Sequence, residues 1–174
     1  LRGDYPISAS QVWAAFFGTA TDPLAAHFVL DERAPRVVAG LLVGAALGMS
    51  GAVFQIVSGN PLGSPDIIGF TTGAASGALM SIVVFDAGPA QTAAGAVLGG
   101  LATAAVVYAL SSHQGHVASH RLVLVGIGVG ACLAALNTLL LVRASLGAAQ
   151  TAAQWLAGSL NAMLWPRVQL MALA

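Results

Sequence analysis

Three histidines in one polar loop have the spacing in this chain that is most typical of metal ligands. His113, His116 and His120 lie three and four residues apart, so on a helix their imidazole rings would share one face. The loop that holds them, residues 111–120, contains Gly115 and no carboxylate or thiol. We therefore interpret it as a solvated turn and expect neither a metal site nor a cofactor.

The glycine-rich run at residues 126–130 (GIGVG) imitates part of a dinucleotide-binding fingerprint. That fingerprint requires a preceding strand and a helix N-terminus at the phosphates, whereas this run lies in the middle of an apolar segment. A phosphate-binding Walker loop requires a lysine, and the chain contains none. We therefore expect neither a dinucleotide site nor ATP binding by that route. A net charge of zero without a basic patch also argues against nucleic acid as a partner.

Polar side chains inside apolar segments are the next candidates for function. Gln55, Thr71, Thr72 and Asn137 each fall within a run that is otherwise largely apolar. A polar group at membrane depth must find a partner, so these side chains face either other helices or a water-filled pathway. We treat all four as candidate pathway-lining residues, with helix-to-helix hydrogen bonding as the alternative.

The elements that must position these residues are membrane helices. Hydrophobic residues make up 57% of the chain and charged residues 7%, far below the roughly one quarter that is usual in a soluble domain. Residues 37–65 carry no charged side chain, and that run is longer than the roughly 20 residues a helix needs to cross a bilayer. The composition therefore predicts a lipid-embedded protein.

The apolar pattern predicts an all-α fold, a polytopic transmembrane helical bundle. We expect four full spans, at about 35–57, 64–85, 89–110 and 121–142, then a short external helix at 148–156 and the start of a fifth span at 165. Pro35 suits the first position of its helix, and Ser64 and Ser119 suit the caps of the second and fourth spans. Residues 1–35 are expected to form an external segment, and residues 36–174 the membrane helices.

The external segment contains a short helix with an apolar face. The polar residues 8–11 (SASQ), followed by Val12, Trp13, Ala14, Phe16 and Phe17, predict that this helix is capped at its start. Trp13 on this helix would suit the membrane–water interface, and packing against the protein itself is an equally good interpretation. Asp22 and Pro23 are expected to form a turn.

Glycines recur at every fourth position in two runs, which are Gly40, Gly44, Gly48 and then Gly69, Gly73, Gly77. Residues four apart lie on one helical face, so each run gives a smooth surface that another backbone can approach closely. The same spacing recurs at residues 95 and 99 and at residues 126 and 130. We predict that these faces are helix-packing sites.

Several ordered motifs resemble one family of membrane permeases. They are RAPR at 33–36, GAAL at 44–47, SGA at 50–52, Gln55, NPL at 60–62, Gly69, RL at 121–122, Trp155 and GSL at 158–160. These motifs resemble the type II ABC importer permeases, which import ferric siderophores, haem and cobalamin into bacteria. The segments NPLGSPDIIGF, LVGIGVG, ALNTLLLVRASL and AGSLNAMLW resemble most the ferric enterobactin permease branch of that family.

The resemblance implies sidedness and a gate. It places residues 1–35 and 143–162 outside the cell and residues 58–65 and 111–120 in the cytoplasm. It also implies that Asn60 and Leu62 form one element of a cytoplasmic gate and Ser119 another. The family often has a short polar residue where this chain has Ala118. The charges themselves leave the sidedness open.

The resemblance further implies a multi-pass protein of the bacterial cell membrane, in contact with lipid, that moves a ferric siderophore inward. It implies a transport subunit and not an enzyme, with ATP hydrolysis in a separate partner. Its expected partners are a second permease subunit, identical or paralogous, ABC ATPase subunits and an extracytoplasmic siderophore-binding protein. Family members have about ten helices, so residues 1–174 would match the second to fifth helices and the start of the sixth. The chain would then be the N-terminal half of a permease domain without its first helix.

Three alternatives to siderophore import stay open at this point. A haem or cobalamin permease would have the same fold and the same motifs. A passive channel is suggested by the Asn60–Pro61 pair, because water channels have Asn-Pro boxes at half-helices, but a second such box is missing here. A structural membrane protein would use the glycine faces for packing alone.

Overall fold

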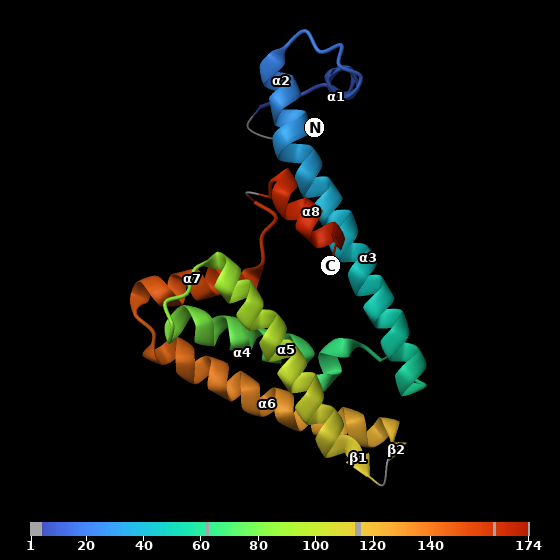
Figure 1. Cartoon of the computed structure of the whole chain (residues 1–174), viewed down its shortest axis with the longest axis vertical. Helices are drawn as coiled ribbons and strands as arrows, with labels where there is room; N and C mark the ends of the chain where they lie inside the picture. The colour runs from blue at the N-terminus through green and yellow to red at the C-terminus, as the bar shows by residue number, and fades with distance from the viewer. Residues whose placement is uncertain (1–4, 62, 114–115, 162, 174) are drawn as a thin grey trace. The chain divides into compact units, whose positions relative to one another are not determined.

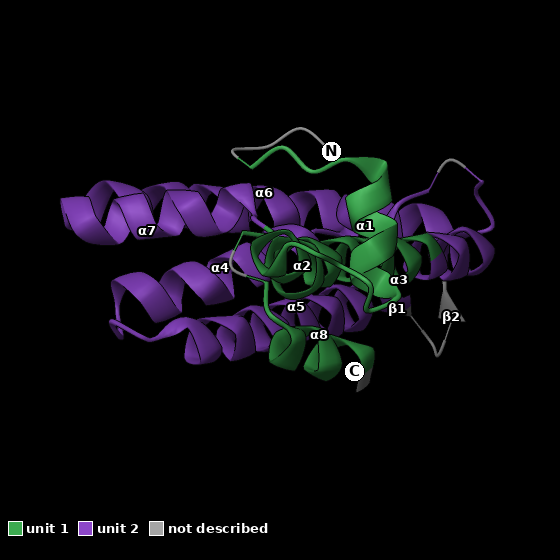
Figure 2. Ribbon diagram, turned by 90° about the horizontal axis from the view of Figure 1, so that it is seen from above, with its two compact units in different colours: residues 1–48, 160–174 green, residues 49–159 purple. Residues whose placement is uncertain are grey.

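The computed structural model describes residues 5–61, 63–113, 116–161 and 163–173 (Figure 1). Helices dominate these residues, which confirms the predicted all-α class. The chain divides into two compact units, one made of residues 1–48 and 160–174 and the other of residues 49–159 (Figure 2). We describe each unit by itself.

The first unit is built on one long helical stretch. Helix α2 (Pro23–His27) continues through a π-helical turn (Phe28–Arg33) into α3 (Ala34–Ser58), whose last ten residues belong to the second unit. Helix α1 (Ala9–Phe16) precedes this stretch, and α8 (Trp165–Leu173) completes the unit. The prediction that this short helix is capped is confirmed, and its cap is a reciprocal capping box of Ser8 and Gln11.

Two sequence predictions about the start of this stretch are wrong. Asp22 and Pro23 do not form an isolated turn, because the Asp22 side chain caps α2 and Pro23 is its first residue. Pro35 is not at the start of its helix either, since helical backbone runs from Pro23 to Ser58. A proline ring inside a helix clashes with the preceding turn, and the wider π-helical turn directly before Pro35 relieves that clash.

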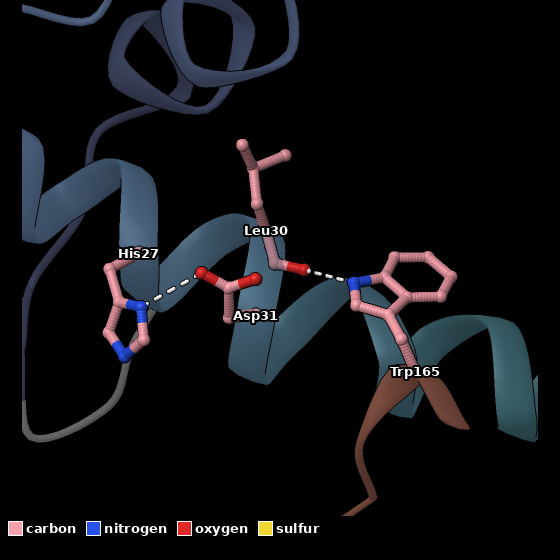
Figure 3. A network of polar contacts seen from close by, with 4 residues as sticks. All are labelled: His27, Leu30, Asp31 and Trp165. Carbon is pink, nitrogen blue, oxygen red and sulfur yellow. Dashed lines mark hydrogen bonds and ion pairs between the residues drawn. The ribbon is translucent and has the colours of Figure 1, made fainter. Parts of the chain in front are cut away.

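The π-helical turn leaves one carbonyl that the helix does not bind. The Ala34 N–H donates to the Val29 carbonyl, and Pro35 has no N–H to offer to the Leu30 carbonyl. The indole N–H of Trp165, from α8, donates to that Leu30 oxygen at 2.9 Å (Figure 3). Trp165 therefore supplies the hydrogen bond that Pro35 removes.

We predict that Trp165→Phe destabilises the protein through this one bond. Phenylalanine keeps most of the ring but has no donor, so the expected loss is about 1 kcal/mol, the usual net value of a hydrogen bond. Pro35→Ala restores a backbone N–H near the Leu30 carbonyl. In a double-mutant cycle on the full-length protein, Trp165→Phe should therefore cost less in the Pro35→Ala background. Equal thermal destabilisation in both backgrounds would show that the indole acts only through packing.

Charged and polar groups hold the N-terminal segment against this helix. Tyr5 donates its hydroxyl hydrogen to the Asp22 carboxylate at 2.8 Å, and Arg33 donates to the Tyr5 carbonyl at 2.7 Å. The hydrogen bond from Tyr5 lowers the pKa of Asp22 and raises the pKa of Tyr5 itself. His27 contacts Asp31 at 2.8 Å (Figure 3). These contacts form a polar collar at one end of the long helix.

The second unit is organised around α4 (Phe70–Val83), which contacts α5 (Pro89–Ser111), α6 (Ser119–Arg143) and α7 (Leu146–Ala157). A 3-10 turn (Pro65–Ile68) precedes α4. Ser64, which was predicted to cap the second span, caps this turn, whereas the helix of the span begins later, at Phe70. The two-residue strands β1 (Ser112–His113) and β2 (His116–Val117) pair antiparallel between α5 and α6. Buried Leu79, Ile82 and Ala152 join α4 to α7.

Among the described residues, three helical stretches are long and apolar enough to cross a membrane, at Pro23–Ser58, Pro89–Ser111 and Ser119–Arg143. The predicted second span differs, because its helix has 14 residues, or about 21 Å at 1.5 Å per residue. Gly69 separates the 3-10 turn from α4 with a left-handed backbone, φ +74°. The sequence pattern did not reveal this break because the residues on both sides of it are apolar.

Ser119 does not cap α6, contrary to the prediction. Ala118 occupies the N-cap position, no side chain makes a cap hydrogen bond there, and Ser119 is the first helical residue. The fourth span itself lies where it was expected.

Candidate functional site

Helix α3 ends at Ser58 in a well-defined helix end. Gly59 has φ +61°, its N–H donates to the Ile56 carbonyl at 3.2 Å, and the Asn60 N–H donates to the Gln55 carbonyl at 3.2 Å. This pair of bonds is a Schellman motif, in which a glycine in left-handed conformation closes the helix. The Asn60 carbonyl then accepts from the Gly63 N–H at 3.0 Å. The break is therefore a hydrogen-bonded turn that places Asn60 directly after the end of α3.

A cavity of about 450 Å³ lies between this turn and the start of α6. Ser58 and Asn60 line it from the turn, and Ser119, His120, Val123 and Leu124 line it from α6. Ser58, Asn60, Ser119 and His120 all contribute atoms to the wall, but the surface that faces the cavity is almost entirely apolar. Two of the residues predicted for a gate, Asn60 and Ser119, are thus brought to one cavity. The third, Leu62, lies outside the described residues.

Sequence reasoning missed His120, Val123 and Leu124 as cavity residues. His120 was considered only as a metal ligand. Val123 and Leu124 lie one turn beyond Ser119 and His120 on α6, and this spacing places them on the same side of the helix. In the sequence, only their spacing of one helical turn from Ser119 and His120 could have identified Val123 and Leu124 as cavity residues.

Close helix packing occurs where α4 meets α5. A Cβ added at Gly77 would lie 2.8 Å from the Gly95 carbonyl carbon and 3.1 Å from the Gly99 Cα. One added at Gly73 would overlap the Thr103 side chain and lie 3.0 Å from the Gly99 carbonyl oxygen. The α5 face therefore repeats the spacing of four, at residues 95, 99 and 103. That continuation of the run was the signal that could have identified Thr103.

The α4 face continues in the same way in both directions. A Cβ at Gly69 would lie 3.0 Å from the Gly130 Cα of α6, and the Ser81 side chain contacts the Gly95 position of α5. Both hydroxyls at this helix pair are satisfied locally, because Ser81 donates to the Gly77 carbonyl at 2.9 Å and Thr103 donates to the Gly99 carbonyl at 2.8 Å. Neither hydroxyl therefore needs a partner on the other helix.

The first glycine run has a different setting. A Cβ at Gly40 would lie 3.7 Å from Leu160 Cδ1, an ordinary van der Waals distance. Added at Gly44 or Gly48, it would meet no described atom of the same unit within 4 Å. The role of this run in close helix packing stays a prediction.

The four candidate pathway residues are placed differently from one another. Asn137 of α6 donates its side-chain N–H to the Thr72 carbonyl of α4 at 3.4 Å, so one candidate bonds to the backbone of another between helices. Thr71 donates to the Asp66 carboxylate, and Gln55 is exposed. The buried Asn137 Oδ1 has no hydrogen-bond partner among the described atoms. Helix-to-helix bonding thus accounts for part of this set, and a pathway role stays a prediction.

A larger cavity, of about 540 Å³, lies at the other end of the second unit. It is lined by α7 and by the start of α5, with Thr92, Thr151, Gln154, Trp155 and Ser159 contributing polar groups. Sequence reasoning did not single out this site. Thr151 and Trp155, four residues apart on the short helix, were its available signal.

The loop between α5 and α6 was considered as a metal site on sequence alone. In the part of the chain that the structure describes, no group of three or more His, Cys, Asp or Glu side chains could hold a metal ion. The side chains of His113 and His116 lie outside that part, whereas His120 lines the smaller cavity.

Comparison with known proteins gives consistent matches over the whole chain. A model of the FecCD transport family matches residues 1–174. The chain is 47% identical over 166 residues to the ferric enterobactin transport system permease protein FepG of Escherichia coli, covering 95% of this chain and 49% of that protein. It is 41% identical over 143 residues to the achromobactin transport system permease protein CbrC of Dickeya dadantii, covering 81% and 41%.

A solved structure has the same fold. It is described as an inward-facing conformation of a metal-chelate type ABC transporter, and it matches with a TM-score of 0.76 and 30% identity over 86% of this chain and 47% of that chain. The chain spans about half the length of the relatives that it matches.

Proposed function

Because this chain belongs to the FecCD transport family, we propose that it forms part of the permease subunit of an ATP-driven importer that carries a ferric siderophore into a bacterial cell. The similarity to a ferric enterobactin permease supports a catecholate chelate as the cargo. The long apolar helices place the chain in the cell membrane as a multi-pass protein.

The importer would need three kinds of protein partner. ABC ATPase subunits would hydrolyse ATP, since this segment contains no lysine for a Walker loop. A second permease subunit, identical or paralogous, would complete the central path. An extracytoplasmic binding protein would deliver the ferric siderophore. Permeases of this class perform no covalent chemistry, so transport depends on two helix packings of similar energy that partner binding can bias.

The observation that carries the proposal at residue level is the cavity that Asn60 and Ser119 share. We place this cavity at the cytoplasmic exit of the path, with residues 58–65 and the start of α6 as its two movable walls. Leu62, next to the Schellman turn, would be the apolar plug. The pathway would continue past Thr71, Thr72, Asn137 and Gln55.

Uptake by cells tests the cargo. The full-length permease, expressed with its ATPase in a strain that lacks its own ferric enterobactin permease, should restore uptake of iron-labelled enterobactin. A strain that expresses the permease without the ATPase is the control and should not take up the chelate. Restored uptake of haem or cobalamin in place of enterobactin would reject the siderophore proposal, and uptake without the ATPase would support a passive channel.

We expect Leu62→Ala in the full-length transporter to loosen the closed exit without unfolding the protein. Loss of the apolar plug should let the exit leak, so ATP hydrolysis becomes less tightly coupled to siderophore uptake. Uptake per ATP hydrolysed, measured in proteoliposomes with the binding protein present, should therefore fall. If uptake per ATP hydrolysed is unchanged in a well-folded variant, the Asn60–Pro61–Leu62 segment is only a structural turn and not part of a gate.

A further inference from the structure

Helix α1 packs one face against the end of the long helix that carries the polar collar. Ala15 of α1 is buried with Ile7 and with Val29 of the π-helical turn, and Val12 packs against the same cluster. The Tyr5 hydroxyl donates a hydrogen bond to the Asp22 carboxylate, and the Arg33 guanidinium donates one to the Tyr5 carbonyl. These contacts fix which face of α1 is turned away from the protein.

The outward face carries three large aromatic side chains. Trp13, Phe16 and Phe17, at spacings of three and four, are exposed by 64%, 58% and 71%. The rings of Trp13 and Phe17 stack with their centroids 5.8 Å apart and their planes at 18°. Together the two rings on α1 and the ring of its C-cap residue, Phe17, form an aromatic contact surface that stays mostly exposed within its own unit.

The position of this face along the long helix indicates what covers it. Phe16 lines a groove of about 370 Å³ together with Val37 and Val38, which are the first residues of the charge-free run of α3. The same helix exposes Val37 by 62% and Leu41 by 68%, so the aromatic face is continuous with an apolar surface that is long enough to cross a bilayer.

Charges next to this face mark the level of the lipid headgroups. Arg36 pairs with Glu32 at 3.6 Å, and the Asp31 carboxylate contacts the ring of His27, all within the last turns before the charge-free run begins. Aromatic side chains, tryptophan above all, concentrate at this boundary because one part of the ring system is apolar and the indole N–H is polar. Helix α1 has this character, since its N-terminal end carries the polar Ser8–Gln11 capping box and its C-terminal half carries the rings.

We propose that α1 is an interfacial anchor, whose Trp13, Phe16 and Phe17 insert into the lipid headgroup region at the end of the membrane where α3 begins. The ligand is the bilayer surface itself. The anchor fixes the depth of the polar collar and therefore the vertical position of the Pro35 turn, which Trp165 braces. This role is independent of which molecule the transporter carries.

Fluorescence quenching tests the anchor in the full-length permease reconstituted in lipid nanodiscs. The emission of Trp13 is obtained as the difference between the wild type and Trp13→Phe, a change that keeps an aromatic ring. Lipids brominated near the headgroup should quench this emission about twofold more than lipids brominated near the chain end, because interfacial tryptophans lie at headgroup level. No quenching by either lipid would overturn the proposal.

Spin labels give a second measurement with Trp13 intact. A nitroxide at Phe17→Cys should be more accessible to oxygen than to a water-soluble nickel complex, whereas one at the exposed Thr21→Cys, in the loop after α1, should show the reverse. An aqueous result at both positions would overturn the proposal. So would a Phe17→Cys label that neither reagent reaches, since another protein surface would then cover this face.

Discussion

Gly77→Ala is expected to destabilise the full-length permease, although alanine is normally the better helix former. The added methyl carbon would lie only 2.8 Å from the Gly95 carbonyl carbon and 3.1 Å from the Gly99 Cα of α5, too close for an ordinary van der Waals contact. Backbone atoms cannot rotate away as a flexible side chain can, so α4 and α5 must separate. Overpacking of this kind costs about 1–3 kcal/mol. It outweighs the gain of up to about 1 kcal/mol that alanine brings to a helix.

Gly128→Ala is the matched control. Gly128 lies inside α6, in the same unit, and an added Cβ there meets no described atom within 4 Å. This substitution gives the same gain in helix propensity without the clash, so it should leave the melting temperature unchanged or raise it. Equal melting temperatures for Gly77→Ala and Gly128→Ala, measured in detergent or nanodiscs, would show that the close approach of α4 and α5 is not part of the folded transporter.

Sequence patterns predicted the elements of this fold whose causes are local. The capped start of the first short helix and three of the four predicted apolar spans each depend on neighbouring residues, and the structure has them. The spacing of four likewise indicated which face of α4 another helix can approach. Such features need no knowledge of distant parts of the chain.

Features that depend on distant partners could not be predicted from the sequence. Pro35 looked like a helix start because its place inside a continuous helix requires a π-helical turn and the indole of Trp165, 130 residues further along the chain. The break at Gly69 is similar, since the glycine backbone packs on Gly130 of α6. In both cases a tertiary contact, and not the local sequence, selects the backbone conformation.

The candidate site combines both kinds of information. The residues at 58–65 had to interrupt the helix, because Gly59, Pro61 and Pro65 cannot all continue it. That Asn60 and Ser119 act together was implied only by the family resemblance. Their placement on one cavity supports this pairing independently. Asn60 precedes α4 in the chain and Ser119 follows α5, so only the fold brings the two residues together.

The second large effect is expected from tying the two walls of the cavity together. With Asn60→Cys and Ser119→Cys in an otherwise cysteine-free full-length transporter, a short bis-methanethiosulfonate reagent should link the turn to α6. If these walls must separate to release cargo, the linked transporter holds its exit closed. Siderophore uptake should then fall to background and return when the link is reduced.

The control pair, Ser119→Cys with Val123→Cys, places both thiols one turn apart on α6 at the same cavity. The same reagent then occupies the cavity without joining its two walls, so uptake should be largely retained. This control distinguishes a loss of uptake that comes from linking the two walls from a loss that comes only from reagent inside the cavity.

Uptake of ferric enterobactin by proteoliposomes that contain the fully linked Asn60→Cys, Ser119→Cys transporter is the most direct test of the account. We predict no uptake before reduction, normal uptake after it, and uptake by the Ser119→Cys, Val123→Cys control throughout. Normal uptake by a transporter shown by mass spectrometry to be completely linked between residues 60 and 119 would contradict the assignment of this cavity as the exit gate.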